Sequence, residues 1–79
     1  MFRLKEKIQY SSFLQRLKDC KGDVMYQTYE GDTLNLKSAI SQLLFSASIL
    51  HPETARKATI TFTEETDYHV LAEFLEKAG

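Results

Sequence analysis

Residues 58–63, Ala-Thr-Ile-Thr-Phe-Thr, are the stretch that most clearly decides the fold. Ala58, Ile60 and Phe62 alternate with three threonines, and successive side chains of a β-strand point to opposite faces of its sheet. Threonine, isoleucine and phenylalanine are also common in strands. The alternation therefore predicts a strand with one apolar face against a core and one polar face toward water.

Earlier parts of the chain predict three further strands. Apolar side chains recur at alternate positions through most of residues 2–10, which is the spacing of a half-buried strand. Residues 24–29 are rich in strand formers, residues 30–32 read Glu-Gly-Asp, and residues 33–36 return as a short strand. Because glycine and aspartate favour turns, the second and third strands are predicted to form a β-hairpin.

Helical spacing of apolar residues predicts three helices. The first covers residues 12–21, with a capping-box serine at Ser12 and a left-handed C-terminal cap at Gly22. The second covers residues 35–50, and the third covers residues 64–78, with acidic residues at its start. The helices therefore follow the first, third and fourth strands.

The predicted order is β-α-β-β-α-β-α. Residues 1–79 are too few for two hydrophobic cores, so we expect a single domain. Its fold class is predicted to be α+β, an open-faced β-sandwich with a four-stranded antiparallel sheet and three helices on one face. The polar face of the sheet would carry Arg3, Lys5 and Lys7 beside the threonines of the last strand.

The composition excludes several classes of function. The net charge is −1, which argues against a nucleic-acid partner. No apolar run approaches the roughly 20 residues of a membrane helix, so we expect no membrane partner and a cytoplasmic location. Cys20, the single cysteine, cannot form an internal disulfide and lies on the apolar stripe of the first helix. We expect no metal, no cofactor, and a monomer or weak homodimer.

Four segments together resemble a known family. They are residues 22–24, Leu-Asn-Leu-Lys-Ser at 34–38, the strand at 58–63, and Leu-Ala-Glu-Phe-Leu-Glu at 71–76. The chain resembles HPr, the histidine-containing phosphocarrier of the bacterial phosphotransferase system. The resemblance implies an HPr-like sandwich and a protein partner from the phosphotransferase system or its regulation. It also implies that Ser38 is a site of regulatory phosphorylation.

The chain departs from this family at the phosphoacceptor. The family carries Gly-(Leu/Ile)-His-Ala-Arg-Pro-Ala at the first helix, whereas residues 8–13 read Ile-Gln-Tyr-Ser-Ser-Phe. A phosphohistidine carrier needs an imidazole nitrogen as acceptor and helix N–H groups that hold the anion. We therefore expect a non-enzymatic regulatory or protein-binding module. Two alternatives remain open: an active phosphocarrier with His51 as a displaced acceptor, and a purely structural domain.

The candidate site residues lie at the starts of the first two helices and on the second helix. Ser38 is the candidate for phosphorylation, and an ordinary first-turn serine is the alternative. Ser11 and Ser12 occupy the place of the missing histidine, where they would bind a partner or an anion, or simply cap the helix. His69 is expected to be a surface histidine.

The second helix carries the remaining candidates. Its inward stripe is predicted to contain Ile40, Leu43 and Leu44. Phe45 and Ile49 fall away from the centre of that stripe. They would be covered by the segment that follows the helix or be offered to a partner, which makes them candidates for partner binding.

Overall fold

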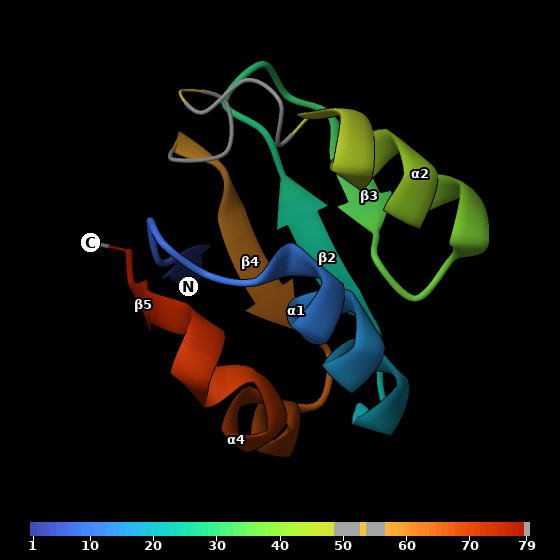
Figure 1. Cartoon of the computed structure of the whole chain (residues 1–79), viewed down its shortest axis with the longest axis vertical. Helices are drawn as coiled ribbons and strands as arrows, with labels where there is room; N and C mark the ends of the chain where they lie inside the picture. The colour runs from blue at the N-terminus through green and yellow to red at the C-terminus, as the bar shows by residue number, and fades with distance from the viewer. Residues whose placement is uncertain (49–52, 54–56, 79) are drawn as a thin grey trace.

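The computed structural model describes residues 1–48, 53 and 57–78, and its fold is α+β, as predicted (Figure 1). Five strands form one antiparallel sheet in the order β3-β2-β4-β1-β5. They are β1 (Phe2–Leu4), β2 (Val24–Gln27), β3 (Thr33–Asn35), β4 (Thr59–Phe62) and β5 (Leu75–Lys77). The strand predicted most clearly, β4, lies at the centre of the sheet, where it pairs with both β1 and β2.

The helices are short and several end in 3-10 turns. They are α1 (Tyr10–Arg16) with η1 (Leu17–Asp19), α2 (Ala39–Ser48), and α4 (Tyr68–Leu71) between η2 (Glu65–Asp67) and η3 (Ala72–Phe74). Figure 1 shows α1 and α4 in front of one face of the sheet, with α2 beside β3. In the part of the chain that the structure describes, no helix is long and apolar enough to cross a membrane.

The core lies between the sheet and the helices. The apolar stripe expected for the first helix was Phe13, Leu14, Leu17 and Cys20; Phe13, Leu17 and Cys20 are buried there, and Leu14 is partly buried against the core. From the sheet, Tyr26 of β2 and Ile60 of β4 have no exposed surface. The predicted hairpin is also confirmed, because β2 and β3 pair directly and Gly31 in the turn between them has a positive φ of 98°. That φ suits a residue without a Cβ.

The prediction of four strands was wrong, because the last helix ends early. Leu75 is extended, and residues 75–77 pair with β1 as a fifth strand. This pairing supplies hydrogen-bond partners to the backbone groups of β1 that face away from β4. Without it, β1 would form an exposed sheet edge. Leu75 lies opposite Leu4, and both side chains are buried, so the apolar spacing that predicted a longer helix serves a strand instead.

The start of the chain also differs from its prediction. The first strand ends at Leu4, although the Lys5 N–H still donates to the Phe74 carbonyl (2.9 Å) in register with the pairing of β1 and β5. Lys5 and Lys7, predicted on the polar sheet face, therefore lie beyond the strand. Ile8 and Tyr10 still pack against the core, which explains why the alternation continues past the strand.

Gly22 was wrongly predicted to be a left-handed helix cap. Among the described residues, Gly31 is the glycine with a positive φ. Gly22 is needed because there is no room for a side chain. A Cβ at this position would lie 2.6 Å from Thr63 Oγ1 and 2.9 Å from Glu64 Cβ. The loop after η1 therefore approaches the end of β4 too closely for a side chain.

Candidate functional site

Ser38 lies immediately before α2, in a turn that starts the helix. The Asn35 side chain accepts a hydrogen bond from the Lys37 N–H (3.0 Å), and the Ser38 N–H donates to the Asn35 carbonyl (2.9 Å). The first helical bond follows, from the Gln42 N–H to the Ser38 carbonyl (3.0 Å). Ser38 itself is exposed, so its hydroxyl is accessible at the start of the helix.

The predicted orientation of α2 was wrong. Ile40, Leu43 and Leu44, assigned to the core, are 71%, 73% and 53% exposed. Phe45, placed away from the centre of the inward stripe, has no exposed surface, and Leu36 just before the helix has none either. Phe45 is therefore a core residue in this structure, and its proposed exposure to a partner is corrected.

Aromatic packing accounts for this orientation. The Phe45 ring contacts the rings of Tyr26, Phe13 and Tyr10, with centroids 5.0, 5.7 and 6.1 Å away. Such clusters gain more than the burial of their area alone. The polar groups that share the inner side of α2 are also satisfied: the Gln42 side chain donates to the Leu36 carbonyl (2.9 Å).

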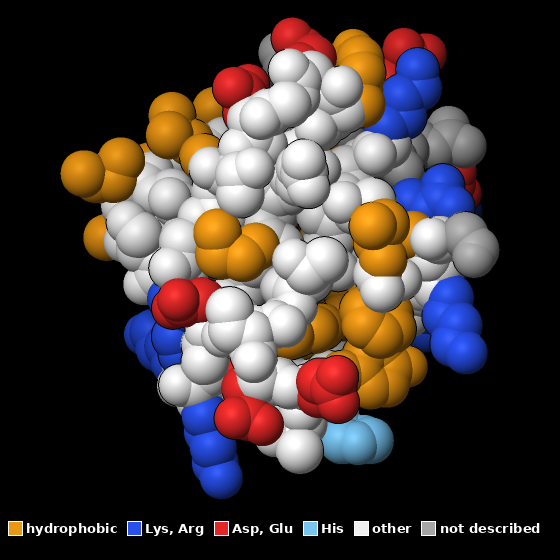
Figure 2. Space-filling model, turned by 180° about the vertical axis from the view of Figure 1, so that it is seen from behind, with side chains coloured by type: hydrophobic (Ala, Val, Ile, Leu, Met, Phe, Trp, Pro, Cys, Tyr) orange, Lys and Arg blue, Asp and Glu red, His pale blue; other side chains and the backbone are white. Residues whose placement is uncertain are grey.

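The outward face of α2 is apolar and uncharged. We define the α2 face as Ile40, Leu43, Leu44 and Ala47, all of which are exposed. No residue from Ala39 to Ser48 is charged, although 27% of the whole chain is. In Figure 2, which views the molecule from behind, hydrophobic side chains project from the left edge, the side on which α2 lies. Exposed apolar patches of this kind mark interaction sites.

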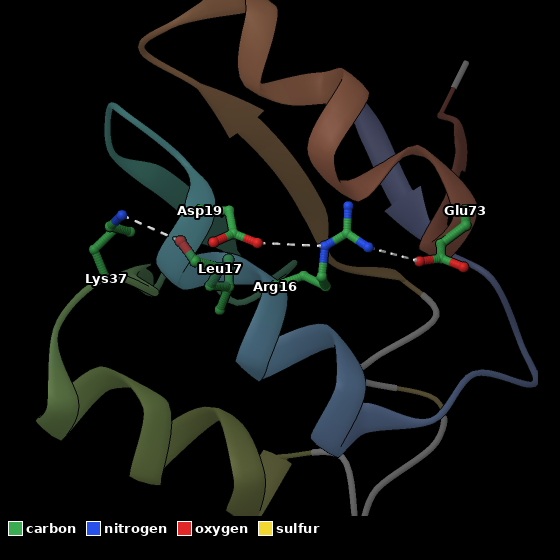
Figure 3. A network of polar contacts seen from close by, with 5 residues as sticks. All are labelled: Arg16, Leu17, Asp19, Lys37 and Glu73. Carbon is green, nitrogen blue, oxygen red and sulfur yellow. Dashed lines mark hydrogen bonds and ion pairs between the residues drawn. The ribbon is translucent and has the colours of Figure 1, made fainter.

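Lys37 fixes this helix to the end of the first one. Its Nζ donates to the carbonyl of Leu17 (3.1 Å; Figure 3) and to that of Cys20 (2.5 Å). A cation therefore caps the C-terminal end of the first helix. Sequence reasoning missed this role, because the two helix ends are far apart in the chain. The hairpin of β2 and β3 lies between these two segments in the chain and returns Lys37 to the end of the first helix.

Two ion pairs of Arg16 lie near this cap. Arg16 Nε is 3.6 Å from Asp19 Oδ2, and Arg16 Nη1 is 3.6 Å from Glu73 Oε1 (Figure 3). All three side chains are about half exposed or more, so these ion pairs contribute little to stability. They join α1 and η1 to η3 without forming a buried charged site.

Asp67 is a buried acid that sequence reasoning also missed. It is 2% exposed, and its carboxylate accepts hydrogen bonds from the N–H groups of Lys21 (2.9 Å) and Gly22 (2.8 Å). Burial by itself would raise the pKa of Asp67, but these two hydrogen bonds, helped by the charge of Lys37, hold that pKa below its ordinary value. The carboxylate is a structural tie between the loop after η1 and the start of α4.

The serines at the start of α1 do not cap it. Gln9 occupies the N-cap position without a side-chain cap bond, and Ser12 Oγ donates to Gln9 Oε1 (3.2 Å). The prediction of a capping box at Ser12 was therefore wrong. Ser12 lines an open hollow of about 480 Å³ together with Lys7 and Arg16, and Ser11 is exposed beside it. No hydrogen bond within the described ranges joins either serine to Ser38.

The remaining candidates divide between described and undescribed positions. Ile49 and His51 lie outside the described residues. His69 is exposed on α4, as expected. Cys20 is a buried free thiol whose pKa is raised by burial and then by the negative charge of Asp67. Among the residues that the structure describes, no group of three or more His, Cys, Asp or Glu side chains could hold a metal ion.

Comparison with known proteins adds no relative to this description. No protein family, curated protein or solved structure matches the chain.

Proposed function

We propose that this chain is a non-catalytic relative of HPr that binds a protein partner through the α2 face. The observation that carries the proposal is the exposure of Ile40, Leu43 and Leu44 on a helix without charged residues. Burial of such side chains against a partner is favourable because it removes apolar surface from water.

The element order supports the kinship with HPr. The chain runs β1-α1-β2-β3-α2-β4-α4, with an antiparallel sheet and the extra strand β5 at its end. This is the order on which the resemblance rests. Ser38 stands directly before α2, as the regulatory serine segment of the family requires, and it is exposed.

The start of α1 favours binding over phosphoryl transfer. Tyr10, Ser11 and Ser12 begin this helix, and none of them supplies the imidazole nitrogen that a phosphohistidine carrier needs. The described lining of the hollow at this position mixes polar, charged and apolar side chains and contains no histidine. The partner is accordingly a protein of the phosphotransferase system or its regulation that recognises HPr-like surfaces.

Ser38 is the candidate switch of this binding. A phosphoserine carries nearly two negative charges at neutral pH and is stabilised near a helix N-terminus. Phosphate on Ser38 would place this charge two residues before Ile40, at the rim of an otherwise uncharged face. Docking of an apolar partner surface would then require desolvation of the phosphate, so phosphorylation is expected to weaken binding.

Intact-protein mass spectrometry tests the chemistry in two incubations. With phosphoenolpyruvate and enzyme I we expect no acid-labile phosphate, and its appearance would overturn the non-carrier assignment. With ATP and the HPr serine kinase we expect one acid-stable phosphate that is absent in Ser38→Ala. A phosphate that persists in Ser38→Ala would remove Ser38 as the switch.

Calorimetric titration with enzyme I tests the docking surface. The wild-type chain and Tyr29→Glu are expected to bind, because Tyr29 is an exposed apolar residue in the hairpin turn, outside α2. Leu43→Glu is expected to lose binding at least tenfold, since it places a charge in the centre of the α2 face. Equal affinity of Leu43→Glu and wild type would contradict the proposal.

A further inference from the structure

The spacing of the α2 face is that of a helix that packs against another helix. Ile40, Leu43, Leu44 and Ala47 stand at i, i+3, i+4 and i+7, the pattern by which amphipathic helices bury one side. In this chain the pattern points outward, and the buried side of α2 carries Phe45 instead. The helix therefore has two packing sides, of which the fold uses one.

We propose that the α2 face associates with the same face of a second copy of this chain. A two-fold symmetric interface places a surface against itself, so any charge in it meets a like charge. The absence of charged side chains from Ala39 to Ser48 removes this repulsion. A face selected mainly for a charged partner would instead carry complementary charges that steer association.

The chemistry of the helix favours an antiparallel pair. Antiparallel packing places the positive N-terminal end of each helix beside the negative C-terminal end of the other. The two-fold axis then passes near Leu43 and Leu44, and Ile40 of each copy faces the small Ala47 of the other. Large and small side chains alternate across the contact, which allows the helices to interlock.

The expected dimer is weak. Each copy contributes one helix of ten residues with three large apolar side chains. The surface that such a contact can bury is smaller than the roughly 800 Å² per partner of a standard interface. Association is therefore concentration-dependent and in exchange with the monomer. The inference rests on the proposed function in one respect: the same face serves both, so a docked protein partner and the second copy exclude each other.

Sedimentation velocity of the isolated chain tests the inference. Over a dilution series from near-millimolar to low micromolar concentration, the wild type is expected to change from dimer to monomer. Leu43→Glu and Leu44→Ser are expected to stay monomeric throughout, while Tyr29→Glu follows the wild type. A monomeric wild type, a dimeric Leu43→Glu, or an equal loss of the dimer in Tyr29→Glu would each overturn the proposal. Circular dichroism establishes that each variant is folded.

Backbone amide NMR spectra over the same dilution series locate the contact. Peaks of residues 39–48 are expected to shift with concentration, and shifts confined to other elements would overturn the assignment to the α2 face. Failure of this inference is distinguishable from failure of the proposed function. A chain that is monomeric but binds enzyme I refutes only self-association, and a dimer that does not bind enzyme I refutes only the docking proposal.

Discussion

The ring of Phe45 packs edge-on against the ring of Tyr26, with centroids 5.0 Å apart and planes at 86°. This contact joins α2 to the central part of the sheet, since Tyr26 belongs to β2. It also determines which side of α2 faces the solvent. The apolar α2 face is exposed because the single aromatic side chain on the opposite side of the helix fills the core.

Truncation of Phe45 is expected to cost far more stability than truncation of Leu43. Phe45→Ala removes a fully buried ring and leaves a cavity, so we expect the free energy of unfolding to fall by about 3–5 kcal/mol. Leu43→Ala removes a side chain that is 73% exposed, and we expect a change of less than about 0.5 kcal/mol. Urea denaturation of the monomer measures both, and similar losses in the two variants would contradict the observed orientation of α2.

Lys37→Met is expected to destabilise the chain through the end of the first helix. The substitution removes the two hydrogen bonds to Leu17 and Cys20 but keeps an apolar stem of similar length. We expect the free energy of unfolding to fall by about 1.5–3 kcal/mol, as for hydrogen bonds to charged groups. Lys18→Met, at an exposed position of η1, is the matched control. An equal effect of the two substitutions would show that the cap contributes nothing specific.

Asp67 is expected to make stability fall at acid pH. Its pKa is lower in the folded chain than in the unfolded chain, where an aspartate has an ordinary pKa of about 3.9. The stabilisation is therefore complete well above that pKa and is lost as the pH falls through it toward the folded value. Asp67→Asn should remove this part of the pH dependence. Denaturation series between neutral and acid pH measure it, and parallel curves for the two proteins would contradict the assigned role.

Gly22→Ala is expected to destabilise the chain by steric overlap. The new Cβ would lie 2.6 Å from Thr63 Oγ1, which accepts a hydrogen bond from the Asp23 N–H (2.8 Å) and is therefore held in place. We expect a loss of about 1–3 kcal/mol in the free energy of unfolding. In a Thr63→Ala background the same substitution should cost less, because the closest atom is gone. A double-mutant cycle without coupling would show that the overlap is relieved elsewhere.

The sequence by itself determined the elements whose pattern is local. Alternation at 58–63 predicted a strand, and turn residues at 30–32 predicted the hairpin. The stripe of Phe13, Leu14, Leu17 and Cys20 predicted the inner side of the first helix, where Leu14 is only partly buried. In each case the spacing along the chain equals the geometric period of the element. The exposure of Ser38 was not predicted from the sequence, and the second helix begins at Ala39, later than predicted.

Only the tertiary structure decided the rest. Periodicity shows which side chains share a face of α2, but the packing of Phe45 against Tyr26 decides which face is buried. The fifth strand requires β1 as its partner. Lys37 donates to backbone carbonyls 20 and 17 residues before it. Asp67 accepts from backbone N–H groups 46 and 45 residues before it. These interactions join segments that are distant in sequence, and they form only when the sheet brings those segments together.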